Sequence, residues 1–331
     1  VVVGGGLLGL EAAKALKDLG LETHVVEFAP RLMAVQVDDG GGKVLRKKIA
    51  ELGVGIHTER NTVEITDGEK CLHVMKFSDG TSLETDMILF SAGIRPRDDI
   101  ARNNGIAVGV RGGIVVDNFC RTNAPDVYAI GECALWEGKI YGLVAPGYQM
   151  ADVACTHILG GQDKEFLGAD MSTKLKLLGV DVASIGDAHG VTAGSINYSY
   201  VDERTQTYKK IVVSADGKKL LGAVLIGDVE AYGDLLQLKL NDMDLPTNPE
   251  ALILPSLDGS SKPLLGADAL PMKAVICSCN NVTKQDLCNA IEGGVTELGE
   301  LKSCTKAATS CGGCAALVGQ VLKCELTKRG V

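Results

Sequence analysis

Three glycines near the start of the chain restrict its fold more than any other feature. Gly4, Gly6 and Gly9 follow the apolar run Val1-Val2-Val3 and open a segment, Leu7–Leu19, whose apolar residues have helical spacing. In such a strand-turn-helix, the first glycine permits a tight turn and the second lets backbone N–H groups approach a pyrophosphate. The third lets the helix pack closely on the strand. The spacing therefore predicts a dinucleotide-binding βαβ unit.

An acidic residue follows where such a unit needs one. Thr23–Glu27 is expected to be the second strand, and Glu27 at its end can accept hydrogen bonds from adenosine ribose hydroxyls while repelling a 2′-phosphate. The site is therefore expected to prefer NADH to NADPH, with Arg31 moderating that preference. Glu11, in the first helix, is a further candidate for this site, although an exposed helix face explains its polarity as well. A glycine-rich turn without a ligand is the alternative for the whole motif.

Length and charge limit the classes of protein to consider. The 331 residues exceed one ordinary domain, and the net charge of −9 argues against nucleic acid or an anionic membrane as a partner. No apolar run is long enough to span a bilayer. Eleven cysteines without a secretory leader favour the cytoplasm, where cysteines serve as metal ligands, redox groups or core residues. The chain opens without Met inside an apolar strand, so we expect residues to precede Val1.

The remaining pattern predicts a mixed α/β chain of several domains. In the first half, elements are expected at Asp38–Leu52 (helix), Leu72–Phe77 and Thr81–Thr85 (hairpin), Met87–Phe90 (strand), Asp98–Asn104 (helix), Ile114–Asp117 and Val127–Ile130 (strands) and Pro146–Leu159 (helix). In the second half, strands are expected at Lys174–Leu178, Val180–Ile185, Lys209–Ser214 and Leu220–Ile226, with a helix at Tyr232–Leu240. Five of the nine prolines lie between Asp244 and Met272, which predicts a linker there.

Two passages resemble the FAD-dependent pyridine nucleotide oxidoreductases. Ser91–Pro96, which contains Gly93, resembles the crossing back into the FAD domain, and Thr122–Cys133 resembles the motif whose acidic residue binds the ribityl chain. The resemblance implies flavin contacts at Gly93, Gly131 and Glu132, with Glu132 standing where the family has Asp. It also implies that the helix near Pro146–Leu159 directs its N-terminus at the flavin. The glycine motif for the FAD pyrophosphate would precede Val1, so the FAD site is expected to be incomplete.

Four cysteines near the C-terminus have the spacing of an iron-sulfur site. Cys277-x-Cys279 and Cys311-x-x-Cys314 form two close pairs, the arrangement needed to hold two irons. Cys311 to Cys314 is expected to open a helix, and Thr283 with Asp286 predicts a capping box for an earlier helix. The region resembles the bacterioferritin-associated-ferredoxin (BFD) type of 2Fe-2S domain. Zinc is the competing metal, although its usual ribbons pair two C-x-x-C knuckles at closer separation.

Cysteines outside these pairs are assigned no metal. Cys288 and Cys324 fall at helical positions where small apolar core residues serve as well, and Cys304 is a spare thiol near the predicted cluster.

The order of these parts resembles the large subunits of assimilatory NADH-dependent nitrite reductases. The passage Gly168–Asp187 carries the resemblance further, and the similarity extends along essentially the whole chain. The expected domains are NAD-binding (1–92), the C-terminal half of an FAD-binding domain (93–165), an α+β interface domain (166–243), a linker (244–272) and a BFD-like 2Fe-2S domain (273–331).

That resemblance implies a function. Electrons would pass from NADH through FAD to the 2Fe-2S cluster, and then to a sirohaem and 4Fe-4S centre, expected beyond Val331, that reduces nitrite to ammonium in nitrate assimilation. It implies a nitrite reductase small subunit as a partner, is compatible with a homodimer, and requires no catalytic acid–base residue here. An NADH-dependent reductase for another acceptor such as rubredoxin, and a ferredoxin-like iron-handling module, are the alternatives. A third alternative is a large α/β protein with incidental glycines and cysteines.

Overall fold

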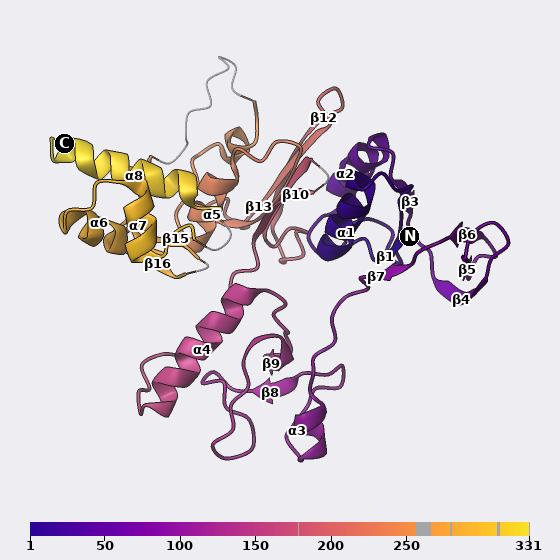
Figure 1. Ribbon diagram of the computed structural model, residues 1–331. Coiled ribbons are helices and arrows are strands. Elements are labelled where there is room, and N and C mark those ends of the chain that lie inside the picture. Colours follow the sequence, from indigo (N-terminus) through magenta and orange to yellow (C-terminus); the bar gives the residue numbers. More distant parts are fainter. Residues whose placement is uncertain (178, 256–265, 279, 310–311, 331) are drawn as a thin grey trace. The chain divides into compact units, whose positions relative to one another are not determined.

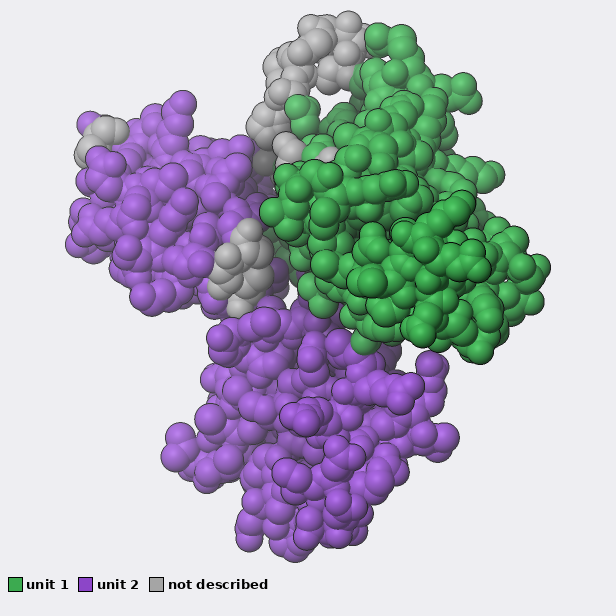
Figure 2. All heavy atoms as spheres, turned by 45° about the vertical axis from the view of Figure 1, so that its right-hand side comes forward, with its two compact units in different colours: residues 1–93, 172–264 green, residues 94–171, 265–331 purple. Residues whose placement is uncertain are grey.

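The computed structural model in Figure 1 describes residues 1–177, 179–255, 266–278, 280–309 and 312–330. The chain forms two compact units, coloured separately in Figure 2. One unit contains residues 1–93 and 172–264, and the other contains residues 94–171 and 265–331. The mixed α/β fold agrees with the expectation from the sequence.

A parallel sheet forms the first half of unit 1. Its order is β3-β2-β1-β7, all neighbours being parallel. The strands are β1 (Val2–Val3), β2 (His24–Val26), β3 (Gly55–His57) and β7 (Leu89–Phe90). The helices α1 (Leu7–Asp18) and α2 (Asp39–Glu51) pack on one face through side chains such as Leu10 and Leu45, both fully buried. The predicted βαβ start is confirmed.

A three-stranded antiparallel sheet, called the arm below, packs against residues of the parallel sheet. It consists of β4 (Thr62–Asp67), β5 (His73–Phe77) and β6 (Ser82–Thr85), in the order β4-β5-β6. Met75 and Phe77 of the arm form a small core with Val1 and Val26. The predicted hairpin is confirmed, and β4 is a strand that the sequence pattern did not indicate.

A five-stranded antiparallel sheet forms the second half of unit 1. Its strands are β10 (Thr173–Leu177), β11 (Val180–Gly186), β12 (Ile196–Asp202), β13 (Thr207–Val213) and β14 (Leu220–Ile226), in the order β10-β11-β14-β13-β12. The helix α5 (Tyr232–Leu240) contacts β11 and β14. Val182, Tyr208 and Val224 share one core with Leu10 and Leu45, so this sheet packs against α1 and α2. Figure 1 shows the two halves side by side.

The contact between α2 and this sheet explains an unusual run of glycines. Gly40, Gly41 and Gly42 occupy the first turn of α2, where each costs about 1 kcal/mol relative to alanine. A Cβ on Gly40 would lie 2.5 Å from the Tyr208 ring, and one on Gly41 would lie 3.2 Å from both Tyr208 and Val224. The helix backbone and the sheet therefore approach most closely at Gly40, where a Cβ would have to displace the Tyr208 ring.

Unit 2 begins with a small region of helix and strand. It contains α3 (Asp99–Asn103), β8 (Ile114–Val116), the 3-10 turn η1 (Gly131–Cys133), β9 (Ala134–Trp136) and α4 (Val144–Ile158). β8 pairs with β9 in parallel, and Met150 of α4 is buried with Phe166 in its core.

The predicted strand at Val127–Ile130 is wrong. Only Tyr128 makes a bridge there, with Arg121, and both Val127 and Ile130 are exposed. Asp126 has a left-handed backbone (φ 61°), which turns the chain just before this segment. The strand that pairs with β8 lies a few residues further on, at Ala134–Trp136.

The C-terminal part of unit 2 is mostly helical. It contains β15 (Val275–Cys277), β16 (Val282–Thr283), α6 (Lys284–Glu292), α7 (Leu298–Thr305) and α8 (Ala315–Lys328). The capping box is confirmed, because Thr283 and Asp286 each bond the other's backbone N–H at the start of α6.

The expected linker, 244–272, contains two 3-10 turns, η2 (Pro249–Leu252) and η3 (Ala267–Ala269). Its residues 256–265 lie outside the described part of the chain. The last part packs on the helical region: Leu270 is 2% exposed, and its carbonyl accepts a 2.8 Å hydrogen bond from the buried Lys284 ammonium.

Candidate functional site

The glycine turn after β1 has a geometry that other residues do not fit. Gly4 has φ 117°, and a Cβ there would lie 2.2 Å from the carbonyl oxygen of Ser91 in the chain after β7. A Cβ on Gly9 would lie 1.9 Å from the Gly4 carbonyl oxygen. These two glycines therefore let α1, β1 and the chain after β7 pack backbone to backbone.

Gly6 faces open space instead. A Cβ on Gly6 would meet no atom within 4 Å among the described residues. Gly6 is also the N-cap of α1 and supplies no side-chain acceptor for the N–H groups of the first turn. Unsatisfied N–H groups and the positive end of the helix dipole attract an anion such as a phosphate. The turn thus has both the room and the charge for a pyrophosphate.

Glu27 reaches the same turn from the end of β2. Its Oε2 accepts a hydrogen bond from the Gly5 N–H (2.5 Å), and its Oε1 accepts one from the Ala29 N–H (2.8 Å). A carboxylate has about four acceptor sites, so capacity is left for ribose hydroxyls. Arg31 is engaged elsewhere, since its guanidinium contacts the Val37 carbonyl (2.8 Å) and the Asp39 carboxylate (2.6 Å). The local charge therefore opposes a 2′-phosphate. The remaining candidate, Glu11, lies on an exposed face of α1.

The residues expected to contact flavin fall in two places. Gly93 (φ 87°) follows β7 in unit 1, whereas Gly131 (φ 72°) and Glu132 form η1 in unit 2. Gly131 lies against α4, because a Cβ on Gly147 would be 3.5 Å from the Gly131 Cα. The Glu132 carboxylate is exposed near Gly142, which precedes α4. An acidic side chain and a helix N-terminus are thus adjacent, as a ribityl and isoalloxazine site requires.

Two of the four predicted cluster ligands can be placed. Cys277 ends β15 and is 2% exposed, and Cys314 is the N-cap of α8. Cys279 and Cys311 lie outside the described residues. Within the described part, no three His, Cys, Asp or Glu side chains gather as a metal site. A buried thiol and a thiol at a helix N-terminus suit an anionic iron-sulfur cluster, so the two placed donors fit that group.

The loops around these cysteines are tied together. The Asn280 amide donates hydrogen bonds to the Lys306 carbonyl (2.6 Å) and the Thr309 hydroxyl (3.2 Å). This connects the loop after Cys277 with the loop that leads to α8.

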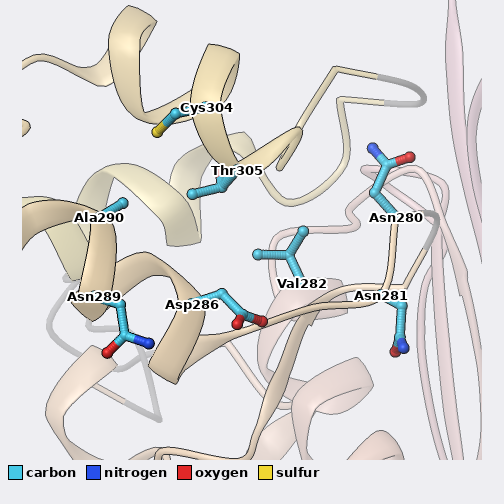
Figure 3. A pocket seen from close by; sticks show the side chains of 8 residues that line it. All are labelled: Asn280, Asn281, Val282, Asp286, Asn289, Ala290, Cys304 and Thr305. Atoms are coloured by element: carbon cyan, nitrogen blue, oxygen red, sulfur yellow. The ribbon is translucent and has the colours of Figure 1, made fainter.

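Beside these loops is an open hollow of about 420 Å³, shown in Figure 3, which includes Cys304 in its lining. Cys288 is buried in α6, as expected for a core residue.

Comparison with known proteins identifies three families along the chain. The pyridine nucleotide-disulphide oxidoreductase family matches residues 1–157, the C-terminal domain of rubredoxin NAD+ reductase matches residues 172–239, and the BFD-like 2Fe-2S binding domain matches residues 275–323. The NAD(P)H nitrite reductase large subunit of Klebsiella oxytoca is 62% identical over all 331 residues, and the NADH nitrite reductase large subunit of Escherichia coli (strain K12) is 58% identical over the same length. Along its whole length, the chain is similar to the large subunits of nitrite reductases.

The nitrite reductase large subunits that it resembles are much longer than this chain. The chain covers 34% of the Klebsiella relative and 39% of the Escherichia relative. Rubredoxin-NAD(+) reductase of Alcanivorax borkumensis is 30% identical over 227 residues, covering 69% of this chain and 57% of that protein. A ferredoxin reductase structure from Rhodopseudomonas palustris has a TM-score of 0.62 at 25% identity, covering 78% of this chain and 62% of that one.

These matches make the chain an oxidoreductase segment with NAD(H), FAD and a 2Fe-2S cluster as its cofactors. In the part of the chain that the structure describes, no helix has the length and apolar character needed to cross a membrane.

One group of polar residues near the glycine turn is not indicated by any sequence motif. Asp38, at the start of α2, contacts Tyr208 and Lys210 of β13, and Tyr208 is 170 residues away in the sequence. The Gly40-Gly41-Gly42 run was the available signal, because glycines inside a helix are unfavourable and are typical of a close approach to another element.

Proposed function

We propose that this chain is the electron-transfer segment of an NADH-dependent nitrite reductase. In this proposal electrons go from NADH through FAD to the 2Fe-2S cluster, and then to a sirohaem and 4Fe-4S centre that reduces nitrite to ammonium. The observation that supports it is the identity of 62% and 58% with two nitrite reductase large subunits over all 331 residues. A small-subunit partner, a homodimer and a cytoplasmic location belong to the same proposal.

The dinucleotide part of the proposal assigns residues 1–92 to NADH. Gly6 and the first turn of α1 would hold the pyrophosphate, and Glu27 would hold the adenosine ribose. The support is the open space over Gly6 together with the placement of Glu27 at the same turn. Gly4 and Gly9 would shape the turn without touching the ligand. Glu11 is retained as a peripheral candidate for the same site.

The flavin part assigns residues 93–165 to FAD. Glu132 would bind the ribityl chain, while Gly93 and Gly131 would give the backbone room beside the flavin. The support is the closeness of η1 to the start of α4. FAD held there would supply the chemistry that converts a hydride from NADH into single electrons. The residues of the chain supply binding and orientation, which need no acid or base.

The cluster part assigns residues 273–331 to the 2Fe-2S centre, with Cys277, Cys279, Cys311 and Cys314 as ligands. The dipole of α8 would stabilise the negative charge of the Cys314 thiolate, because Cys314 is the N-cap of this helix. Cys277 would keep one side of the cluster away from water because its side chain is buried. A rubredoxin-type reductase is less well supported, since the rubredoxin reductase relative has lower identity and matches a smaller share of the chain.

Two measurements test this function. First, the purified chain, reconstituted anaerobically with iron and sulfide, should show the visible absorption of a 2Fe-2S cluster. Replacing Cys314 by serine should remove it, whereas the buried Cys288→Ser variant should keep it. A colourless protein that contains zinc would contradict the cluster assignment.

Second, the full-length protein carrying this segment should reduce nitrite with NADH. Its Cys314→Ser variant should lose that activity at least about a hundredfold but still reduce ferricyanide, which accepts electrons from flavin. Nitrite reduction that survives loss of the cluster would rule out the proposed electron path.

A further inference from the structure

The segment between Glu27 and α2 forms one wall of the glycine turn. The Met33 N–H donates a 2.8 Å hydrogen bond to the Gly5 carbonyl, and the Leu32 side chain packs beside Gly5. Leu32 and Met33 are buried, and the Glu27 carboxylate bonds the Gly5 N–H. The location of residues 28–38 therefore fixes where Gly5 and Glu27 lie.

The other end of this segment is held by the five-stranded sheet and its loops. The Val35 carbonyl lies 2.9 Å from Nε2 of His189, and the Asp38 carboxylate accepts hydrogen bonds from the Tyr208 hydroxyl (2.8 Å) and the Lys210 ammonium (3.0 Å). The Lys210 side chain is only 8% exposed. Three contacts from the α+β half thus reach a segment that otherwise belongs to the dinucleotide half.

Asp38 is suited to carry this connection. Burial by itself would raise the pKa of Asp38, but hydrogen bonds from the Gly41 N–H, Tyr208 and Lys210, together with the Lys210 charge, lower it below the usual value. Asp38 is therefore ionised at neutral pH and binds both partners by charge-assisted hydrogen bonds. It also caps α2, so movement of Asp38 would move the helix start as well.

We propose that Tyr208, Lys210 and His189 are positioning residues of the dinucleotide site, which hold residues 28–38 so that Gly5 and Glu27 are preformed for the adenosine half of NADH. This inference rests on the proposed NADH binding. The three residues act through Asp38 and Val35 and do not touch the ligand. Their loss therefore weakens NADH binding and leaves electron transfer from bound NADH unchanged.

Two neighbouring lysines of β13 offer a matched test. Lys209 and Lys210 alternate to opposite faces of the sheet, both side chains are 8% exposed, and each pairs with an aspartate. Lys209 pairs with Asp228 (2.5 Å), away from the segment. Lys210→Met and Lys209→Met each remove the ion pair of a lysine whose side chain is 8% exposed, with Asp38 (16% exposed) more buried than Asp228 (38%). Lys210 also donates 3.3 Å hydrogen bonds to the carbonyls of Ala188 and His189. Only Lys210→Met removes a contact to residues 28–38.

The dissociation constant of NADH is measured by titration calorimetry on the chain and compared with its melting temperature. We expect Lys210→Met to weaken NADH binding about tenfold and Lys209→Met to leave it unchanged, even where both lower the melting temperature alike. Tyr208→Phe keeps the ring over Gly40 and removes only the hydroxyl, so the variant protein remains folded. We expect this variant to bind NADH about threefold more weakly. Its control is Tyr200→Phe, on the opposite sheet face.

The outcomes separate the inference from the proposed function. Equal NADH affinity in the wild type, Lys210→Met and Tyr208→Phe proteins would overturn the positioning role while leaving NADH binding intact. Absence of NADH binding by the wild type would overturn the proposed function itself. In the full-length protein, Tyr208→Phe should raise KM for NADH by the same factor as the dissociation constant without changing kcat. A fall in kcat at unchanged KM would refute the positioning role.

Discussion

Alanine at Gly9 or at Gly6 separates the packing role of the glycine turn from its binding role. In Gly9→Ala the new Cβ would lie 1.9 Å from the Gly4 carbonyl oxygen and 2.9 Å from the Gly4 carbonyl carbon. A relaxed contact between carbon and oxygen is about 3.3 Å, so α1 must retreat from the turn by about 1.4 Å. Both contacting atoms belong to the backbone, which leaves no side chain to yield.

The stability cost of Gly9→Ala follows from two opposing effects. Overpacking costs about 1–3 kcal/mol, and alanine regains up to about 1 kcal/mol of helix propensity. A net loss of about 1 kcal/mol lowers the melting temperature by about 2–4 °C for a unit of this size. Gly6→Ala should leave it unchanged, because its Cβ meets no atom and its φ of −79° suits alanine. That Cβ would instead fill the space proposed for the pyrophosphate.

The assay pairs thermal unfolding with NADH titration. Gly9→Ala should lower the melting temperature, whereas Gly6→Ala should keep it and bind NADH at least about tenfold more weakly. If Gly6→Ala binds NADH as tightly as the wild type, the pyrophosphate does not lie over Gly6. If Gly9→Ala has the same melting temperature as the wild type, the close approach of α1 to the turn is not the reason for glycine at position 9.

Three further predictions concern other sites. Glu27→Gln removes the charge that repels a 2′-phosphate and should reduce the preference for NADH over NADPH about tenfold; an unchanged ratio of the two dissociation constants would count against this role. Thr283→Ala removes the capping box of α6 and should cost about 1 kcal/mol in urea unfolding, with Thr283→Ser as the control that retains most of it. Burial, followed by nearby positive charges, lowers the pKa of His57, so the folded state binds protons less readily than the unfolded state. Stability should therefore fall as the pH drops below about 6.5, and His57→Asn should flatten that dependence in unfolding curves between about pH 5 and 7.

Local signals in the sequence determined the glycine turn after β1 and the capping box of α6. Gly9 is required by a backbone contact with Gly4, five residues earlier, and Thr283 bonds a residue three positions later. Such interactions have fixed spacings, so a sequence pattern is enough to predict them. The cysteine spacing likewise predicts a cluster, and the matching 2Fe-2S family supports that assignment.

Only the tertiary structure decided which residues support the turn from outside. Nothing in the sequence near Asp38 indicates Tyr208 or Lys210, because their meeting depends on how the five-stranded sheet packs against α2. Likewise, the apolar residues Val127 and Ile130 match a strand pattern, yet Ala134–Trp136 pairs with β8 instead. Hydrophobic periodicity reports which residues are apolar but not which strand finds a partner, since pairing and sheet packing are settled by contacts between distant parts of the chain.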